Sequence, residues 1–119
     1  MSIVLYGIPN CDTVRKARSW LEARELEYAF HDYKKAGIGA DKLRDWVKVR
    51  GWEAVLNRKG STFRKLPEEA RSDLDAEKAV QLMMVHTSTI KRPILEHPEG
   101  LLLGFDASDW SEALAGERA

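Results

Sequence analysis

The first 32 residues carry the pattern of a strand, a helix and a second strand, and this pattern constrains the fold more than any other feature. Residues 3–6 are an apolar run that stops at a glycine, residues 14–21 place apolar side chains at helical spacing, and residues 26–32 alternate between apolar and polar. A strand, a helix and a strand within about 30 residues form a βαβ unit with parallel strands and a right-handed crossover. We expect Asn10 or Cys11 to cap the helix.

The remainder of the chain predicts further helices and then a hairpin. After a loop at residues 37–39, the segment from 41 to about 86 has helical patterns in several pieces, interrupted by a basic polar loop at residues 57–65. Two apolar runs at residues 94–95 and 101–103 flank a turn that contains proline and glycine, which favours a β-hairpin.

A last helix, capped by Asp106 or Ser108, is expected to run through Leu114. The order βαβ, helices, ββα is typical of an α/β protein with the thioredoxin-like fold and a helical insertion between the second and third strands. We expect a single domain over residues 1–119, with the insertion at about residues 38–88.

Composition excludes several classes of protein. The chain has 119 residues, 44% of them hydrophobic, and its 19 basic residues balance 19 acidic ones. A balanced charge provides no overall field to hold a polyanion, so we expect no direct binding of nucleic acid. The first residues lack the pattern of a signal peptide, and no apolar run approaches the length of a membrane span. We therefore expect a cytoplasmic monomer.

Cys11 is the only cysteine in the chain, so an internal disulfide is excluded, and too few metal-ligating residues cluster for a zinc site. It follows the first strand and stands at the predicted start of a helix, where unpaired amides and the helix dipole favour a thiolate. A free cysteine is more often a small buried apolar residue. The polar neighbours Asn10, Asp12 and Thr13 argue against burial and favour a nucleophile.

Two further features involve arginines. Arg92 precedes Pro93 at the start of a predicted strand, and a cis bond there would fix the backbone so that Arg92 could face the thiol. On the residues alone, a surface arginine with a trans proline is the commoner arrangement. In the basic loop, Arg58 and Arg64 could bind an anion in a bidentate way, although a solvated charged loop is the commoner meaning.

Together these features resemble a known family. Tyr-Gly-Ile-Pro-Asn-Cys-Asp-Thr at residues 6–13, Arg-Lys-Ala at 15–17 and Lys-Arg-Pro-Ile at 91–94 are similar to the arsenate-reductase-like (ArsC/Spx) family, which also contains the Spx-type transcriptional regulators. Gly-Trp-Glu-Ala at residues 51–54 and Phe-Arg-Lys-Leu at 63–66 resemble its YffB-like branch.

The resemblance implies a thioredoxin-like sheet with an inserted helical part, and it gives several residues a role. It makes Cys11 the nucleophile and Arg92 the anion-binding arginine before a cis proline, Pro93. Asn10, Asp12 and Thr13 would then belong to the loop that binds substrate or glutathione. Arg58 would be a shifted counterpart of the loop arginine of arsenate reductases, with Arg64 as the competing choice.

The departures from the family pattern also carry information. Glutathione-linked arsenate reductases have a histidine where this chain has Gly7, and a third arginine in the region of Leu103, Gly104 and Phe105. We therefore expect poor reduction of arsenate. Redox-switching Spx regulators carry Cys-x-x-Cys, whereas the fourth position here is Val14.

Two functions of different classes follow. The first is a thiol-dependent reductase without a bound cofactor, in which Cys11 attacks a small oxidised substrate or an oxyanion and a second thiol, from glutathione or a glutaredoxin-type donor, resolves the adduct. The alternative is a non-catalytic, Spx-like regulatory or protein-binding module. Its partner surface could include Trp46, Trp52, Met83 and Met84, although amphipathic spacing explains Trp46 and Met83 as core. His31, His86 and His97 are expected to have no direct role.

Overall fold

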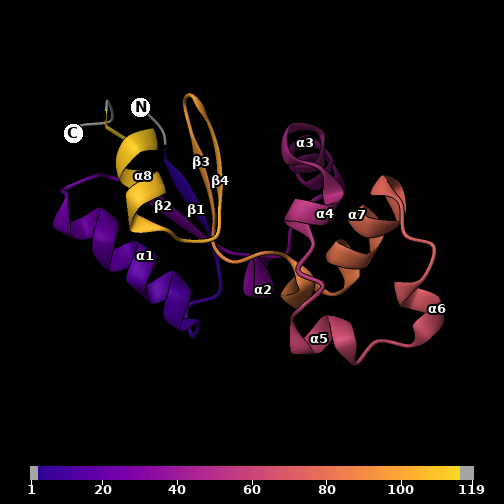
Figure 1. Ribbon diagram of the computed structural model, residues 1–119. Helices are drawn as coiled ribbons and strands as arrows, with labels where there is room; N and C mark the ends of the chain where they lie inside the picture. Colours follow the sequence, from indigo (N-terminus) through magenta and orange to yellow (C-terminus); the bar gives the residue numbers. More distant parts are fainter. Residues whose placement is uncertain (1–2, 116–119) are drawn as a thin grey trace. The chain divides into compact units, whose positions relative to one another are not determined.

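The computed structural model describes residues 3–115, and the chain divides into two compact units (Figure 1). Unit 1 contains the chain up to Asp32 and from Arg92 onward, and unit 2 contains the intervening Tyr33–Lys91. Unit 2 is therefore an insertion into unit 1 between its second and third strands, as the sequence predicted.

Unit 1 is built on a four-stranded sheet with the order β2-β1-β3-β4. Strands β1 and β2 are parallel, whereas β1 with β3 and β3 with β4 are antiparallel. This mixed topology confirms the predicted βαβ unit, the hairpin and the α/β thioredoxin-like fold. The strands are β1 (Val4–Gly7), β2 (Ala29–Asp32), β3 (Ile94–His97) and β4 (Gly100–Leu103).

Helices α1 (Asp12–Ala23) and α8 (Ala107–Ala113) pack on one face of this sheet, because side chains of both helices join one apolar cluster with side chains of β1 and β3. Trp110 is central to it: its ring lies 5.9 Å from that of Trp20 and 4.9 Å from that of Phe105. The buried members of the cluster are Ile3, Leu5, Ala17, Leu21, Leu26, Leu95, Trp110 and Leu114.

The predicted strand at residues 26–32 is shorter in the structure and begins only at Ala29. Glu25, in the left-handed region with φ 59°, ends α1, and the amide of Leu26 donates to the carbonyl of Leu21 at 3.0 Å. Leu26 is therefore part of the helix C-terminus while its side chain still reaches the core. The predicted face was right and the predicted strand start was wrong.

Unit 2 is helical and contains α2 (Tyr33–Ala36), α3 (Ala40–Arg50), α4 (Trp52–Val55), α5 (Ser61–Arg64), α6 (Glu68–Arg71), α7 (Ala76–Val85) and the 3-10 turn η1 (Thr87–Thr89). The predicted loop at residues 57–65 is wrong in its second half, where α5 forms one turn that buries Phe63. Trp46 and Met83 are buried, which confirms them as core residues.

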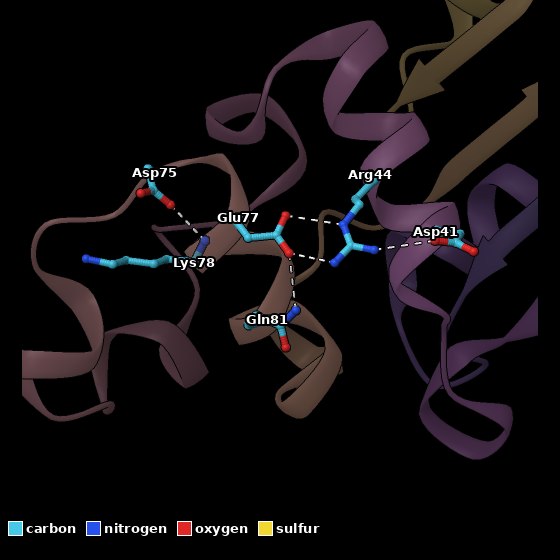
Figure 2. A network of polar contacts seen from close by, with 6 residues as sticks. All are labelled: Asp41, Arg44, Asp75, Glu77, Lys78 and Gln81. Carbon is cyan, nitrogen blue, oxygen red and sulfur yellow. Dashed lines mark hydrogen bonds and ion pairs between the residues drawn. The ribbon is translucent and has the colours of Figure 1, made fainter.

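A polar network joins α3 to α7 (Figure 2). The guanidinium of Arg44 donates to both carboxylate oxygens of Glu77, at 2.6 and 3.2 Å, and lies 3.4 Å from Asp41. The hydrogen bond from Arg44 is the main cause that holds the pKa of Glu77 below its ordinary value. Asp75 caps α7 by accepting the amide of Lys78 at 2.8 Å.

Candidate functional site

Cys11 occupies the N-cap position of α1. Its backbone is extended, with φ −93° and ψ 127°, and its side chain makes no capping hydrogen bond. The Cys11 amide donates to the carbonyl of Ile8 at 3.2 Å, and its carbonyl accepts the amide of Arg15 at 2.9 Å. These bonds to the turn and the helix fix the backbone of Cys11. The residue is only half-buried, so its thiol is not enclosed in the core.

The first turn of α1 supplies the electrostatic environment of this cysteine. In any helix the first amides have no intrahelical acceptor, and the dipole adds partial positive charge at this end. In α1 these amides belong to Asp12, Thr13 and Val14. Thr13 and Asp12 are exposed, whereas Val14 is fully buried. The first turn of α1 therefore presents partial positive charge to an anion that binds beside Cys11.

Arg15 is a residue that sequence reasoning missed. Its Nη2 donates to the carbonyl oxygen of Asn10 at 3.0 Å, and its Nη1 lies 3.2 Å from Oδ1 of Asp12. Arg15 thus contacts the residues on both sides of Cys11. The available signal was the acid–base spacing of three residues between Asp12 and Arg15, which brings two side chains together on a helix.

The Arg92-Pro93 peptide bond is cis, as the resemblance implied. Tyr6 pairs with Ile94 in the antiparallel register of β1 and β3, so one residue further along the two strands Gly7 lies opposite Pro93. Arg92 and Pro93 therefore enter the sheet at the end where β1 leaves it toward Cys11. Pro93 is buried and Arg92 is half-buried.

The segment after β4 lies at this same end of the sheet. The amide of Gly104 donates to the carbonyl of Pro93 at 2.8 Å, and the carbonyl of Gly104 accepts the indole Nε1 of Trp110 at 3.0 Å. Gly104 has φ 71°, a conformation that glycine adopts without strain. The place where the resemblance called for a third arginine is therefore taken by a backbone connection between the cis-proline turn and α8.

Arg58 and Arg64 lie in unit 2. Nη2 of Arg58 is 3.5 Å from Oε2 of Glu53, and its guanidinium lies 5.5 Å from the centre of the Trp52 ring. Arg64 is the last residue of α5 and is exposed. Of the predicted site residues, the structure gathers Asn10, Cys11, Asp12, Thr13, Arg92 and Pro93 in unit 1 and assigns Arg58 and Arg64 to unit 2.

The three histidines lie within or at the ends of helices and strands. The His31 ring lies 5.1 Å from the ring of Tyr6 on the neighbouring strand, while His86 is the C-cap of α7 and His97 ends β3. Across residues 3–115, no group of three histidine, cysteine or acidic side chains is arranged to hold a metal ion. Over the same residues, none of the helices combines the length and apolarity needed to cross a membrane.

Comparison with known proteins places this site in context. Residues 6–113 match the model of the ArsC family. The match includes both the cysteine turn around Cys11 and the cis-proline turn at Arg92 and Pro93. The chain belongs to the ArsC family. Among ArsC-related structures, a YffB protein is 50% identical, with a TM-score of 0.92 over 95% of this chain and 99% of that one.

Two other relatives extend the comparison. An arsenate reductase (ArsC) related protein from Brucella melitensis is 49% identical, with a TM-score of 0.75, covering 94% of this chain and 93% of that chain. An uncharacterized protein of Haemophilus influenzae is 34% identical over 113 residues, which are 95% of this chain and 99% of the relative. This ArsC-family chain is therefore similar over nearly its whole length to relatives of about its own size.

Proposed function

We propose that this ArsC-family protein is a glutathione-linked monothiol oxidoreductase that acts through Cys11. The observation that carries the proposal is the position of Cys11 as an N-cap residue whose side chain makes no capping bond, so the thiol stands at the amide-rich end of α1. The thiolate is the nucleophile in thiol–disulfide exchange, and reactive cysteines are commonly found at the N-terminus of a helix.

In the first step the Cys11 thiolate attacks one sulfur of a disulfide, R–S–S–R′. A bond forms between Sγ of Cys11 and the sulfur of R, the original S–S bond breaks, and R′–S⁻ leaves with the electron pair and takes a proton from water. Arg92 and the first amides of α1 stabilise negative charge during this exchange. Asn10, Asp12, Thr13 and Pro93 form the surrounding turns.

The second step needs a thiol from outside the chain, because Cys11 is the only cysteine. A glutathione thiolate attacks the mixed disulfide, forms glutathionyl–S–S–R and releases Cys11 as a thiolate. The net reaction exchanges one disulfide for another, and the protein returns to its starting state. No bound cofactor takes part, and the oxidised substrate is a small disulfide or a disulfide of another protein.

The test is to incubate the reduced protein with oxidised glutathione and to map the product by mass spectrometry. We expect one glutathionyl group on Cys11, removed again when reduced glutathione is added. Cys11→Ser is the control and should gain no adduct. The proposal fails when the wild-type thiol forms no adduct, or when reduced glutathione does not release the adduct.

A second candidate function, a protein-binding module, is favoured by one observation. Val49, Met84 and Val85 of unit 2 are 64%, 37% and 75% exposed, and exposed apolar side chains are common in partner surfaces. Two results together would favour this function over the oxidoreductase. Cys11 would not react with disulfides, and the protein would form a stable complex with another protein that Val85→Ser abolishes.

A further inference from the structure

Arg15 contacts the turn that holds Cys11 from both sides. One guanidinium nitrogen donates to the carbonyl of Asn10 at 3.0 Å, and a second lies 3.2 Å from the carboxylate of Asp12. The backbone amide of Arg15 in addition donates to the carbonyl of Cys11 at 2.9 Å. The planar fork of an arginine makes such paired contacts.

These contacts bear on the chemistry of the Cys11 sulfur because Asp12 carries a negative charge. It directly follows Cys11 and is the first residue of α1, where a carboxylate stabilises the helix. The same carboxylate repels a thiolate on Cys11 and any anionic substrate that approaches it. Because Arg15 pairs with Asp12, this negative charge is compensated at the place where an anion would bind.

The pair contributes little to folding, which separates its role from stability. The side chain of Arg15 is 58% exposed and that of Asp12 is 85% exposed. Exposed pairs of this kind change the free energy of unfolding only slightly. A conformational or electrostatic effect on Cys11 can therefore be measured in folded variants.

Arg15 also lines a shallow groove of about 520 Å³ in unit 1. A second cation, Lys16, lines the same groove, whose other wall includes Phe105 of the β4–α8 connection. Gly104, next to Phe105, is bonded to Pro93 of the cis-proline turn. Arg15 and Lys16 of α1 therefore share this groove with Phe105, while Cys11 lies outside it.

We propose that Arg15 is a positioning residue for Cys11, which compensates the charge of Asp12 and so allows an anionic sulfur compound to approach the thiol. The inference rests on the proposed function, since it concerns the reactions of the same cysteine. The substrates it concerns are thiols or disulfides that carry carboxylates, which an uncompensated Asp12 would repel.

The test compares two alkylating reagents that differ by one negative charge, iodoacetate and iodoacetamide. Their rate constants with Cys11 are measured for the wild type, Arg15→Met, Arg15→Lys, Asp12→Asn and the double variant Asp12→Asn/Arg15→Met. Arg15→Met should lower the ratio of iodoacetate to iodoacetamide rates by about three- to tenfold at low salt, because the charge of Asp12 is then uncompensated. The double variant should restore the ratio, and Arg15→Lys should largely keep it.

Arg24→Met is the matched control, since it removes the same charge at the C-terminal end of α1. It should leave the ratio unchanged. An unchanged ratio in Arg15→Met, an equal loss of rate with both reagents, or a double variant that stays like Arg15→Met would each overturn the proposal. Because alkylation needs no glutathione, a failed adduct with oxidised glutathione would reject the proposed function while leaving this result to be judged separately.

Discussion

Gly7 and Val14 pack so closely that a Cβ atom on Gly7 would lie 2.8 Å from Cγ2 of Val14. These are two positions at which the chain differs from the patterns it resembles: the histidine of glutathione-linked arsenate reductases and the second cysteine of redox-switching Spx regulators. Val14 is fully buried beneath the cysteine turn. Each departure is therefore coupled to the other, since the valine fills the space that a side chain at residue 7 would need.

Gly7→Ala should lower the free energy of unfolding by about 1–3 kcal/mol, the usual cost of adding a methyl group to a packed site. Urea denaturation measures it. Gly39→Ala is the control, because a Cβ there meets no atom within 4 Å, and it should change stability much less. In the double variant Gly7→Ala/Val14→Ala the Val14 methyl groups that cause the clash are absent. The double variant should therefore lose less free energy of unfolding than the two single variants lose in sum. Simple additivity would show that the contact does not limit residue 7.

The protein should reduce arsenate poorly or not at all with glutathione and glutaredoxin supplied. Gly7 leaves no room for the family's histidine, and Gly104 replaces the third arginine with a backbone bond to Pro93. The measurement is arsenite formation, side by side with an established arsenate reductase. Comparable turnover would mean that neither helper group is needed.

Arg92→Ala should slow formation of the glutathione adduct on Cys11 by roughly ten- to a hundredfold, the effect of losing a charged hydrogen bond worth about 1.5–3 kcal/mol. Lys91→Ala is the matched control. Lys91 belongs to unit 2, where its amide donates to the carbonyl of Val55 at 2.8 Å, so its substitution should have little effect on the rate. Circular dichroism confirms folding of both variants. Equal effects from the two substitutions would show that Arg92 is not part of the site.

Acidification should remove the contribution of Glu77 to stability. Its pKa in the folded state is lowered below the ordinary 4.5, chiefly by the hydrogen bond from Arg44. The pair therefore stabilises unit 2 at neutral pH, and this contribution is lost as the pH falls through the lowered value. The urea midpoints of wild type and Glu77→Gln should differ slightly at pH 7 and converge well below pH 4.5. Arg44→Met should behave alike, and a difference that persists in acid would contradict the assignment.

Much of unit 1 could be predicted from the helical period of α1 and from short apolar runs that end at turn residues. Residues 14–21 gave the buried face of α1, and the two apolar runs around the turn gave the hairpin of β3 and β4. The turns α2 and α5 have only four residues each, too few for any period to be visible. Leu26 fits the alternating pattern of a strand. The left-handed conformation of Glu25 before it belongs to the end of α1, and this pattern does not reveal it.

The site was predictable to a similar degree. Cys11 could be found from its place after a strand and before a helix, and the structure makes it the N-cap. Arg92 required the family resemblance, because nothing in its local sequence indicates which way the chain turns before Pro93. Arg15 was missed because its contact with the Asn10 carbonyl depends on the geometry of the cap, which spacing alone does not specify.

The chain leaves unit 1 at Asp32, at the end of β2, and returns at Arg92, just before β3. Both strands flank β1, so the two crossing points are separated by two strand spacings, about 10 Å. The entropy of closing a loop between such points depends only weakly on the length of the loop. An insert at this place can be lengthened, shortened or exchanged at small thermodynamic cost, so unit 2 can change over evolution without rebuilding the turn around Cys11.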